Sequence, residues 1–339
     1  MSWYKEYKEQ WKEIIETVAS EEHRTPQMVE KDAIQSMILL GLSKSEISFV
    51  FKGGTSLSKC YGLIDRFSED IDLSMNCRPT ESEKKKTKNI ITGIGDNMGF
   101  KLMNPDDIQS RHNYNKYVFE YESLFSDIPL ELIVETSFYQ AVYPVEIHEV
   151  GSFIGKFCKQ RNIELPIPFE AAFVNMQVQS LERTFIDKVF AICDYRIQDM
   201  QDRDSRHLYD IAKLLPEIKI MDSIADLIDK VREDRMQSKN NPSAQPKYDI
   251  PEMLNEIIES RFYETDYNNI TKKLLYEDVS YEEAIEGGIA KIAEMEIFMY
   301  RGKISIENAS EKESEEILSE IEGLSNEDLK VTTVKHFTA

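Results

Sequence analysis

The chain has 339 residues, of which 41% are hydrophobic and 30% charged, a balance typical of a soluble globular protein and a length sufficient for two domains. The formal net charge of −21 argues against a protein that binds nucleic acid through a generally basic surface, because phosphate backbones are held by surplus lysine and arginine. No apolar run approaches the roughly 20 residues of a membrane-spanning helix. With no secretory signal pattern and four widely spaced cysteines, we expect a cytoplasmic protein with reduced thiols and no membrane association.

The first 42 residues are predicted to form two helices. Trp11, Ile14 and Val18 recur at helical spacing within residues 4–18. Thr25 followed by Pro26 is typical of a helix start, with the threonine as N-cap and the proline at the first helical position. This second helix is expected to run to about residue 42.

After residue 46 the pattern changes to short strands and helices. The predicted strands are 47–51, 70–75, 117–121, 130–138 and 173–179, and the predicted helices between them are 55–62 and 82–98. From residue 181 the pattern is helical, with a polar loop at 238–246, a strongly acidic stretch at 307–328 and an unpatterned tail from 330. We therefore predict an α/β (α+β) domain with a mixed sheet over residues 1–180. An α-helical domain with an acidic C-terminal region follows over residues 181–339.

The most informative segment joins a Gly-Gly-Thr-Ser turn at 53–56 to Asp70 and Asp72 in the next predicted strand. Two glycines allow the backbone N–H groups to approach a triphosphate closely. Residues i and i+2 of a strand share a face, so both carboxylates point the same way and can hold hard cations such as Mg²⁺. The alternative is an ordinary glycine turn beside an exposed acidic strand, but the order strand, turn, helix, strand favours phosphoryl chemistry.

A third carboxylate is expected from a neighbouring strand. The predicted strand 130–138 carries Glu131 and Glu135, four residues apart and thus on one face. A carboxylate in an apolar strand is costly without a partner, and a metal ion provides one. The alternative is that both glutamates face solvent.

The sequence resembles the AbiEii-type nucleotidyltransferases. These enzymes are the toxin half of type IV toxin–antitoxin and abortive-infection systems, and they include MenT-like toxins. The resemblance spans about residues 29–215. The matching segments are Val29-Glu30-Lys31-Asp32, Gly53-Gly54-Thr55-Ser56-Leu57, Arg66-Phe67-Ser68-Glu69-Asp70-Ile71-Asp72, Leu130-Glu131-Leu132, Glu182-Arg183-Thr184-Phe185-Ile186-Asp187-Lys188 and Arg206-His207-Leu208-Tyr209-Asp210.

The resemblance implies a nucleotidyltransferase-like first domain and assigns roles to individual residues. The residues expected to be catalytic are Asp70, Asp72, Glu131, Lys188 and Asp210, of which the first three are the expected Mg²⁺ ligands. The residues expected to bind the nucleotide are Gly53, Gly54, Thr55, Ser56, Ser68 and Lys188. Glu131 is preferred to Glu135 because Leu-Glu-Leu matches the family strand. In the sequence pattern Asp210 lies opposite an apolar helical stripe, four residues from Arg206 as an ion pair allows, and His207 is interpreted as a bystander.

The function implied is Mg²⁺-dependent transfer of a nucleotide from a nucleoside triphosphate to an acceptor hydroxyl, with a cognate antitoxin as the expected partner. By resemblance the acceptor is the 3′ end of a tRNA or similar RNA. Two alternatives remain open: transfer to a protein or small-molecule hydroxyl, and a nucleotide-sensing regulator without turnover. An RNA end is expected to be gripped locally, by the lysines of residues 84–88 and by Arg203 and Arg206.

Overall fold

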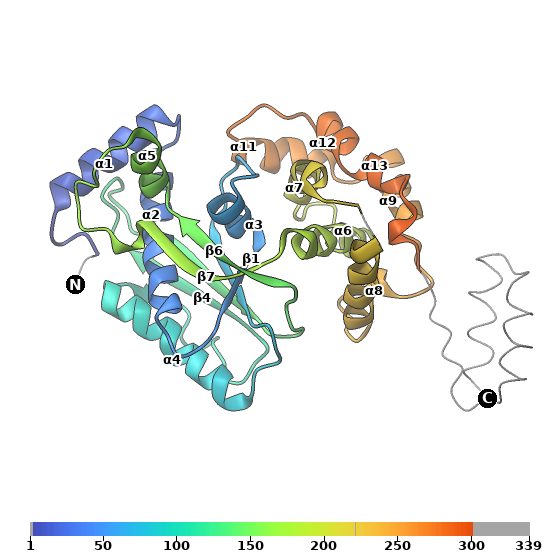
Figure 1. Cartoon of the computed structure of the whole chain (residues 1–339), viewed down its shortest axis with the longest axis horizontal. Helices are drawn as coiled ribbons and strands as arrows, with labels where there is room; N and C mark the ends of the chain where they lie inside the picture. Colours follow the sequence, from blue (N-terminus) through green and yellow to red (C-terminus); the bar gives the residue numbers. More distant parts are fainter. Residues whose placement is uncertain (1–2, 221, 301–339) are drawn as a thin grey trace, which may run out of the picture.

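The computed structural model describes residues 3–220 and 222–300, and it divides into a sheet-containing half and a helical half that lie side by side (Figure 1). The predicted acidic stretch at 307–328 and the tail from 330 lie outside the described residues. No described helix combines the length and the apolar character needed to cross a bilayer.

The described part of the chain forms one mixed seven-stranded sheet in the order β3-β4-β5-β2-β1-β7-β6. The strands are β1 (Val50–Lys52), β2 (Asp70–Ser74), β3 (Lys101–Leu102), β4 (Tyr114–Tyr121), β5 (Leu130–Ser137), β6 (Val145–Gly151) and β7 (Phe173–Gln179). Strand β2 lies near the middle of the sheet, antiparallel to β1 and parallel to β5. This central place fixes the backbone of the Asp-x-Asp segment between two hydrogen-bonded neighbours.

One face of the sheet is covered by helices of the first half. They are α1 (Lys8–Glu21), α2 (Pro26–Ser43), α4 (Glu81–Met98) and α5 (Phe153–Arg161). The predicted cap is confirmed, because the Thr25 side chain accepts a hydrogen bond from the backbone of Met28. Ile71 and Leu73 of β2 are fully buried in the same core as α2, so Asp70 and Asp72 project from the opposite face.

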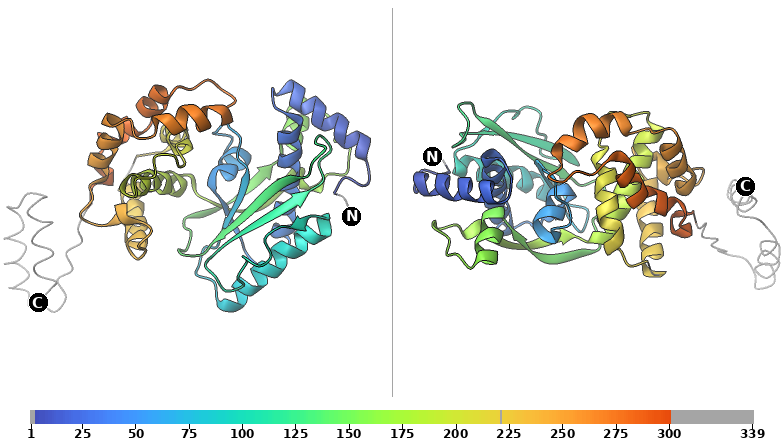
Figure 2. Two further views of the ribbon diagram at one scale, coloured as in Figure 1. Left: turned by 180° about the vertical axis from the view of Figure 1, so that it is seen from behind. Right: turned by 90° about the horizontal axis from the view of Figure 1, so that it is seen from above.

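A short helix links β1 to β2 on the side of the sheet that faces the helical half. It consists of α3 (Gly53–Ser56), which continues directly into the π-helical turn η1 (Leu57–Tyr61). Figure 2 shows from behind and above that this blue segment stands between the sheet and the helices of the second half. The Gly-Gly turn is therefore placed at the junction of the two halves.

The second half consists of helices and connecting loops, with no strand among its described residues, as predicted, and its first helix begins at Leu181. Its elements are α6 (Leu181–Ile197), α7 (Arg206–Leu214), η3 (Leu215–Glu217), α8 (Asp222–Met236), η4 (Pro242–Ala244), α9 (Ile250–Glu259), α10 (Glu264–Asp266), η5 (Tyr267–Thr271), α11 (Lys272–Leu274), α12 (Tyr281–Gly287), α13 (Ile289–Ala293) and η6 (Glu296–Phe298). They enclose a separate apolar core. The fold prediction of a mixed sheet followed by a helical part is confirmed.

The sequence pattern missed β3, β6, α5 and the single turn η2 (Glu170–Ala172). Strand β6 lies at the edge of the sheet, its apolar alternation is limited to Val145 and Ile147, and Ile147 is exposed, so the sequence signal for a half-buried strand is short. The predicted polar loop at 238–246 is present, but it packs inward: Ser243 is fully buried and donates a hydrogen bond to the carboxylate of Asp194.

Candidate active site

Asp70 and Asp72 lie on one face of β2, as predicted, with a neighbour on either side. Across the antiparallel pair with β1, Asp72 is opposite Lys52, and across the parallel pair with β5 it is opposite Glu135. Both aspartates are half-buried. Three acids and a lysine are thus gathered on adjacent strands at one point of the sheet.

The register places Glu135, and not Glu131, beside the aspartate pair. Asp70 is aligned with Ile133 and Asp72 with Glu135, whereas Glu131 lies beyond the paired part of β2, is exposed and pairs across β4 with Glu120. The charge of Glu135 raises the pKa of both aspartates, behind the larger effect of burial. The preference for Glu131 does not fit this register, because four residues along a strand separate two side chains by roughly 13 Å.

The two glycines of the turn are needed for different reasons. Gly53 has a φ of +76°, and a Cβ atom there would stand 2.0 Å from Oδ2 of Asp72. At Gly54 a Cβ would stand 2.5 Å from Nη2 of Arg66 and 2.9 Å from Oγ of Ser68. The backbone of the turn therefore lies directly against Asp72, as a loop that presents N–H groups to a ligand beside these carboxylates requires.

The hydroxyls of the turn are used within the protein. Thr55 and Ser56 are buried, and the Thr55 hydroxyl donates to the backbone carbonyl of Asp70 at 2.5 Å and contacts the Ser68 hydroxyl at 2.9 Å. Ser56 donates to the carbonyl of Gly53 at 2.8 Å. These three side chains hold the turn against β2, so in this structure they shape the predicted nucleotide-binding loop rather than offer free donors.

The carboxylate pair carries an electrostatic cost that a cation would remove. Burial, followed by the charges of Asp72 and Glu135, raises the pKa of Asp70 to about 6. Oδ1 of Asp70 is buried and makes no hydrogen bond. An unpartnered buried carboxylate oxygen next to a second acid fits a hard divalent cation, which prefers oxygen ligands.

The described residues contain no group of three or more His, Cys, Asp or Glu side chains already arranged to hold a metal ion. Glu135 is instead engaged by Lys116 of β4, whose Nζ lies 3.6 Å from its Oε1. A metal ion at this site would thus be held first by Asp70 and Asp72, with Glu135 alongside on β5.

Lys188 and Asp210 lie together in the helical half, on α6 and α7. Lys188 Nζ is 2.6 Å from Oδ2 of Asp210, and both side chains are buried. Lys188 Nζ also lies 3.3 Å from Nδ1 of His207. Burial, reinforced by the charge of Lys188, lowers the pKa of His207 to about 4, so the imidazole is neutral at pH 7 and Nδ1 can accept from the lysine. His207, interpreted from the sequence as a bystander, therefore contacts the lysine of this pair.

A cavity of about 390 Å³ joins the two halves of the site. On the sheet side it is lined by Lys52, Gly53 and Asp72, and on the helical side by Lys188 and His207. Its wall also includes amide and aromatic side chains, namely Tyr139, Gln140, Gln179, Tyr195, Asn240 and Asn241. This composition, which combines charges of both signs with amides and rings, matches what a nucleotide presents.

The comparisons with known proteins show the family of the chain. The family model of the AbiEii nucleotidyl transferase toxins of type IV toxin–antitoxin systems matches residues 38–287. The chain belongs to this family. No curated protein matches it in sequence.

Three solved structures similar to this AbiEii-family chain share little sequence with it. JHP933 from Helicobacter pylori is 16% identical over 87% of this chain and 98% of its own, with a TM-score of 0.43. A putative nucleotidyltransferase from H. pylori is 15% identical over 80% and 94%, with a TM-score of 0.43. MenT4, a nucleotidyltransferase toxin from Mycobacterium tuberculosis, is 15% identical over 89% and 92%, with a TM-score of 0.46.

Sequence analysis of this AbiEii nucleotidyltransferase missed the partner of Asp210. Asp210 is fully buried and binds Arg66, from the loop that follows η1, and not Arg206, which pairs with Asp204 at 2.9 Å. Lys52 was also missed. An isolated charged residue carries no signal of its own in a single sequence; the only hint for Arg66 was its place four residues before Asp70 in the quoted family segment.

The lysines of residues 84–88 lie away from the carboxylate pair of this toxin-family chain. They belong to α4, which packs with α2 on the opposite face of the sheet (Figure 1). Lys84 pairs with Glu81 at 2.9 Å and Lys86 with Glu46 at 2.6 Å. The expectation that this cluster grips an RNA end at the site therefore does not fit the fold.

Proposed function

We propose that the chain catalyses nucleotide transfer from a Mg²⁺-bound nucleoside triphosphate to an acceptor hydroxyl at the cavity between its two halves. The observation that carries the proposal is that Asp72, beside the unpartnered Asp70, and Lys188 line the same cavity from opposite halves. Acids for a cation and a lysine for phosphate charge are the two requirements of phosphoryl transfer chemistry.

Asp70 and Asp72 would hold the cation, with Glu135 as the third carboxylate in place of Glu131. When bound, Mg²⁺ would neutralise phosphate charge and favour the ionised form of an attacking hydroxyl. The fit is supported by this chain's own chemistry: Asp70 has a raised pKa and a buried Oδ1 without a hydrogen bond, and a bound cation would relieve both.

The triphosphate would lie along the Gly53-Gly54 backbone. Lys52 and Lys188 both reach the cavity, so a cation on each side can offset phosphate charge as it develops on the leaving pyrophosphate. Asp210 and His207 fix the Lys188 ammonium from behind, because each accepts a hydrogen bond from Nζ. A preorganised charge of this kind costs no reorganisation during reaction.

The acceptor proposed is an RNA 3′ end, with a tRNA as the first candidate. Support comes from the helical side of the site, where Arg206 acts electrostatically on both Asp70 and Asp72, and Arg203 lies over the ring of Tyr195 at 5.6 Å. Arginine and aromatic side chains next to one another are a common platform for single-stranded nucleic acid. They provide a local grip on an otherwise acidic chain.

The test is incubation of the purified chain with each labelled nucleoside triphosphate, Mg²⁺, total RNA and total protein in separate reactions. Label on RNA that is lost with Asp70→Asn and with Asp72→Asn supports the proposal. Label on protein with RNA untouched would replace the RNA acceptor by a protein hydroxyl. Family membership further implies a cognate antitoxin, which the proposal predicts to suppress this labelling.

A further inference from the structure

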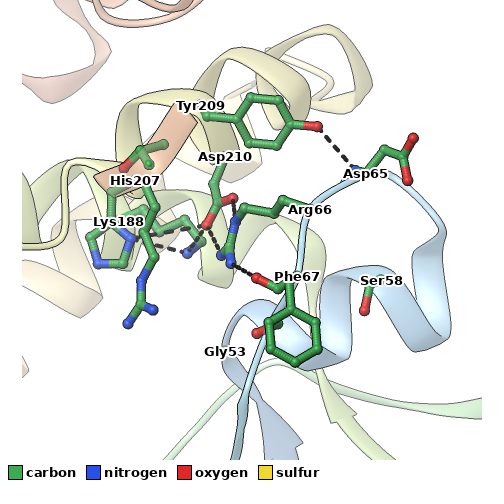
Figure 3. Close-up of polar contacts among 12 residues, drawn as sticks. Gly53, Ser58, Asp65, Arg66, Phe67, Lys188, His207, Tyr209 and Asp210 are labelled. Carbon is green, nitrogen blue, oxygen red and sulfur yellow. Dashed lines mark hydrogen bonds and ion pairs between the residues drawn. The ribbon is translucent and has the colours of Figure 1, made fainter. Parts of the chain in front are cut away.

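Arg66 joins the two halves of the molecule through a fully buried ion pair. Its Nε lies 2.7 Å from Oδ1 of Asp210 and its Nη2 lies 2.8 Å from Oδ2 (Figure 3). The exposed fraction is 3% for Arg66 and 0% for Asp210. The two parallel bonds form the bidentate arrangement in which a guanidinium fixes both position and orientation of a carboxylate.

The same carboxylate holds Lys188. Oδ2 of Asp210 accepts from Lys188 at 2.6 Å as well as from Arg66, so one buried anion lies between two cations. Burial acts to raise the pKa of Asp210, but the charges of Arg66 and Lys188 outweigh it and hold the pKa well below its usual range. A carboxylate paired with two cations in this way is a poor proton acceptor. The group on which Asp210 acts directly is the Lys188 ammonium.

Arg66 also lies against the glycine turn. A Cβ atom at Gly54 would stand 2.5 Å from Nη2 of Arg66, so the guanidinium fills the space that the missing side chain leaves. Its Nη1 donates to the carbonyl of Phe67 at 3.0 Å. One guanidinium thus contacts the glycine turn on the sheet side and the Asp210–Lys188 pair on the helical side.

The residues around Arg66 are held across the same junction. The backbone N–H of Asp65 donates to the Tyr209 hydroxyl at 3.0 Å, and that of Phe67 donates to the carbonyl of Leu274 at 2.9 Å. Figure 3 shows this segment, the strap of residues 65–67, beside the helix that carries Tyr209 and Asp210, with the Arg66 side chain directed at Asp210. These two hydrogen bonds hold the strap backbone in addition to the one from the Arg66 side chain, so a conservative change at this position is expected to fold.

We propose that Arg66 is a positioning residue of nucleotide transfer, which sets Lys188 and the Gly53-Gly54 turn at a fixed separation by holding Asp210, and that Asp210 acts through Lys188 and not on the substrate. This proposal rests on the proposed function. A lysine ammonium cannot replace Arg66, because it keeps the charge but loses the planar fork that defines the geometry.

The test is a double-mutant cycle between Arg66→Lys and Lys188→Ala, measured as kcat and KM for the preferred triphosphate. Arg66→Lys is expected to lower kcat by about 10- to 100-fold with KM changed by less than about 3-fold, since misplacement of a catalytic group by about 1 Å has effects of this size. In the Lys188→Ala background the same change is expected to have almost no further effect.

Arg24→Lys is the matched control, because Arg24 also pairs with an aspartate, but with Asp65 of the strap at 3.2 Å and not with Asp210. It is expected to retain activity. Losses that multiply in the double variant, or full kcat in Arg66→Lys, would overturn the proposal. If Arg66→Lys does not fold, the double-mutant cycle is measured with Asp210→Asn and Lys188→Ala. As before, the second change is expected to add almost nothing to the loss of kcat caused by the first.

A ligand-free measurement separates failure of this proposal from failure of the proposed function. The distance between the Lys188 ammonium and the Gly53-Gly54 turn is expected to differ between crystal structures of Arg66→Lys and of the wild type. An unchanged separation overturns the positioning role whether or not transfer is observed. Absence of transfer by the wild type with every triphosphate and acceptor, together with a changed separation, would instead refute only the proposed function.

Discussion

Gly53 and Asp72 are so close that the glycine can carry no side chain. A Cβ atom at position 53 would stand 2.0 Å from Oδ2 of Asp72, and the φ of +76° is one that other residues rarely adopt. The first glycine of the turn and the second aspartate of the Asp-x-Asp segment are therefore one structural unit, although 19 positions separate them in the sequence.

Gly53→Ala is expected to abolish nucleotide transfer by displacing Asp72, with a loss of at least about 100-fold in kcat/KM. Gly62→Ala is the matched control, because Gly62 has a similar φ of +66° but no atom within 4 Å of the added Cβ. It shares the backbone strain, roughly 1–2 kcal/mol, without the clash. Equal loss of activity in both variants would show that backbone strain alone, and not contact with Asp72, explains why position 53 requires glycine.

Glu135→Gln is expected to reduce Mg²⁺-dependent transfer by at least about 10-fold, and Glu131→Gln to leave it within about 2-fold. The reason is the register, which places Glu135 beside Asp72 and leaves Glu131 exposed at the far end of β5. Activity measured as a function of Mg²⁺ concentration tests this, since loss of a ligand raises the concentration required. A larger loss of transfer in Glu131→Gln than in Glu135→Gln would restore the sequence-based choice of Glu131.

The contrast between these two glutamates shows what the sequence could predict. Most elements up to residue 179, the shared face of Asp70 and Asp72 and the helical second half follow from local periodicity and spacing, whereas β3, β6, α5 and η2 did not. The strand that pairs with β2, and its register, depend on contacts between distant segments that periodicity does not encode. Arg66 and Asp210 are 144 positions apart, and nothing in either segment alone predicts their pairing.

His207 provides a pH-dependent test of the Lys188 environment. Its pKa falls from 6.5 to about 4 on folding, so the folded state binds the proton less tightly than the unfolded state. Stability is thus fully present above about pH 6.5 and is lost progressively as the pH falls toward 4, by about 2–3 kcal/mol in total. His207→Gln should flatten this fall in urea unfolding between pH 7 and 4, whereas the exposed His112→Gln should not. If the free energy of unfolding falls equally steeply with pH in both variants, the group responsible for the fall is not His207.

Lys59→Met tests how the glycine turn is anchored from the core side. Lys59 is buried, and its Nζ contacts Asp32 at 2.5 Å and the Ser36 hydroxyl at 2.8 Å. Removing one partner leaves a buried charge uncompensated, which costs about 3–5 kcal/mol. The control is Lys86→Met, which removes an exposed pair and is expected to cost at most about 1 kcal/mol. Similar unfolding free energies for the two variants would show that the buried pair is not a stabilising anchor.

Expression of the wild-type chain alone is expected to slow bacterial growth, whereas expression of the Asp72→Ala form is expected to leave growth unchanged. Family membership predicts a toxin, and the position of Asp72 against Gly53 ties toxicity to the proposed chemistry. Growth curves after induction, with immunoblots to equalise the amount of protein, measure the effect. Glu131→Gln serves as the control that should remain toxic, since its side chain is exposed and lies away from the aspartate pair. Equal growth inhibition by the wild type and the Asp72→Ala form would mean that toxicity does not arise from nucleotide transfer at this site.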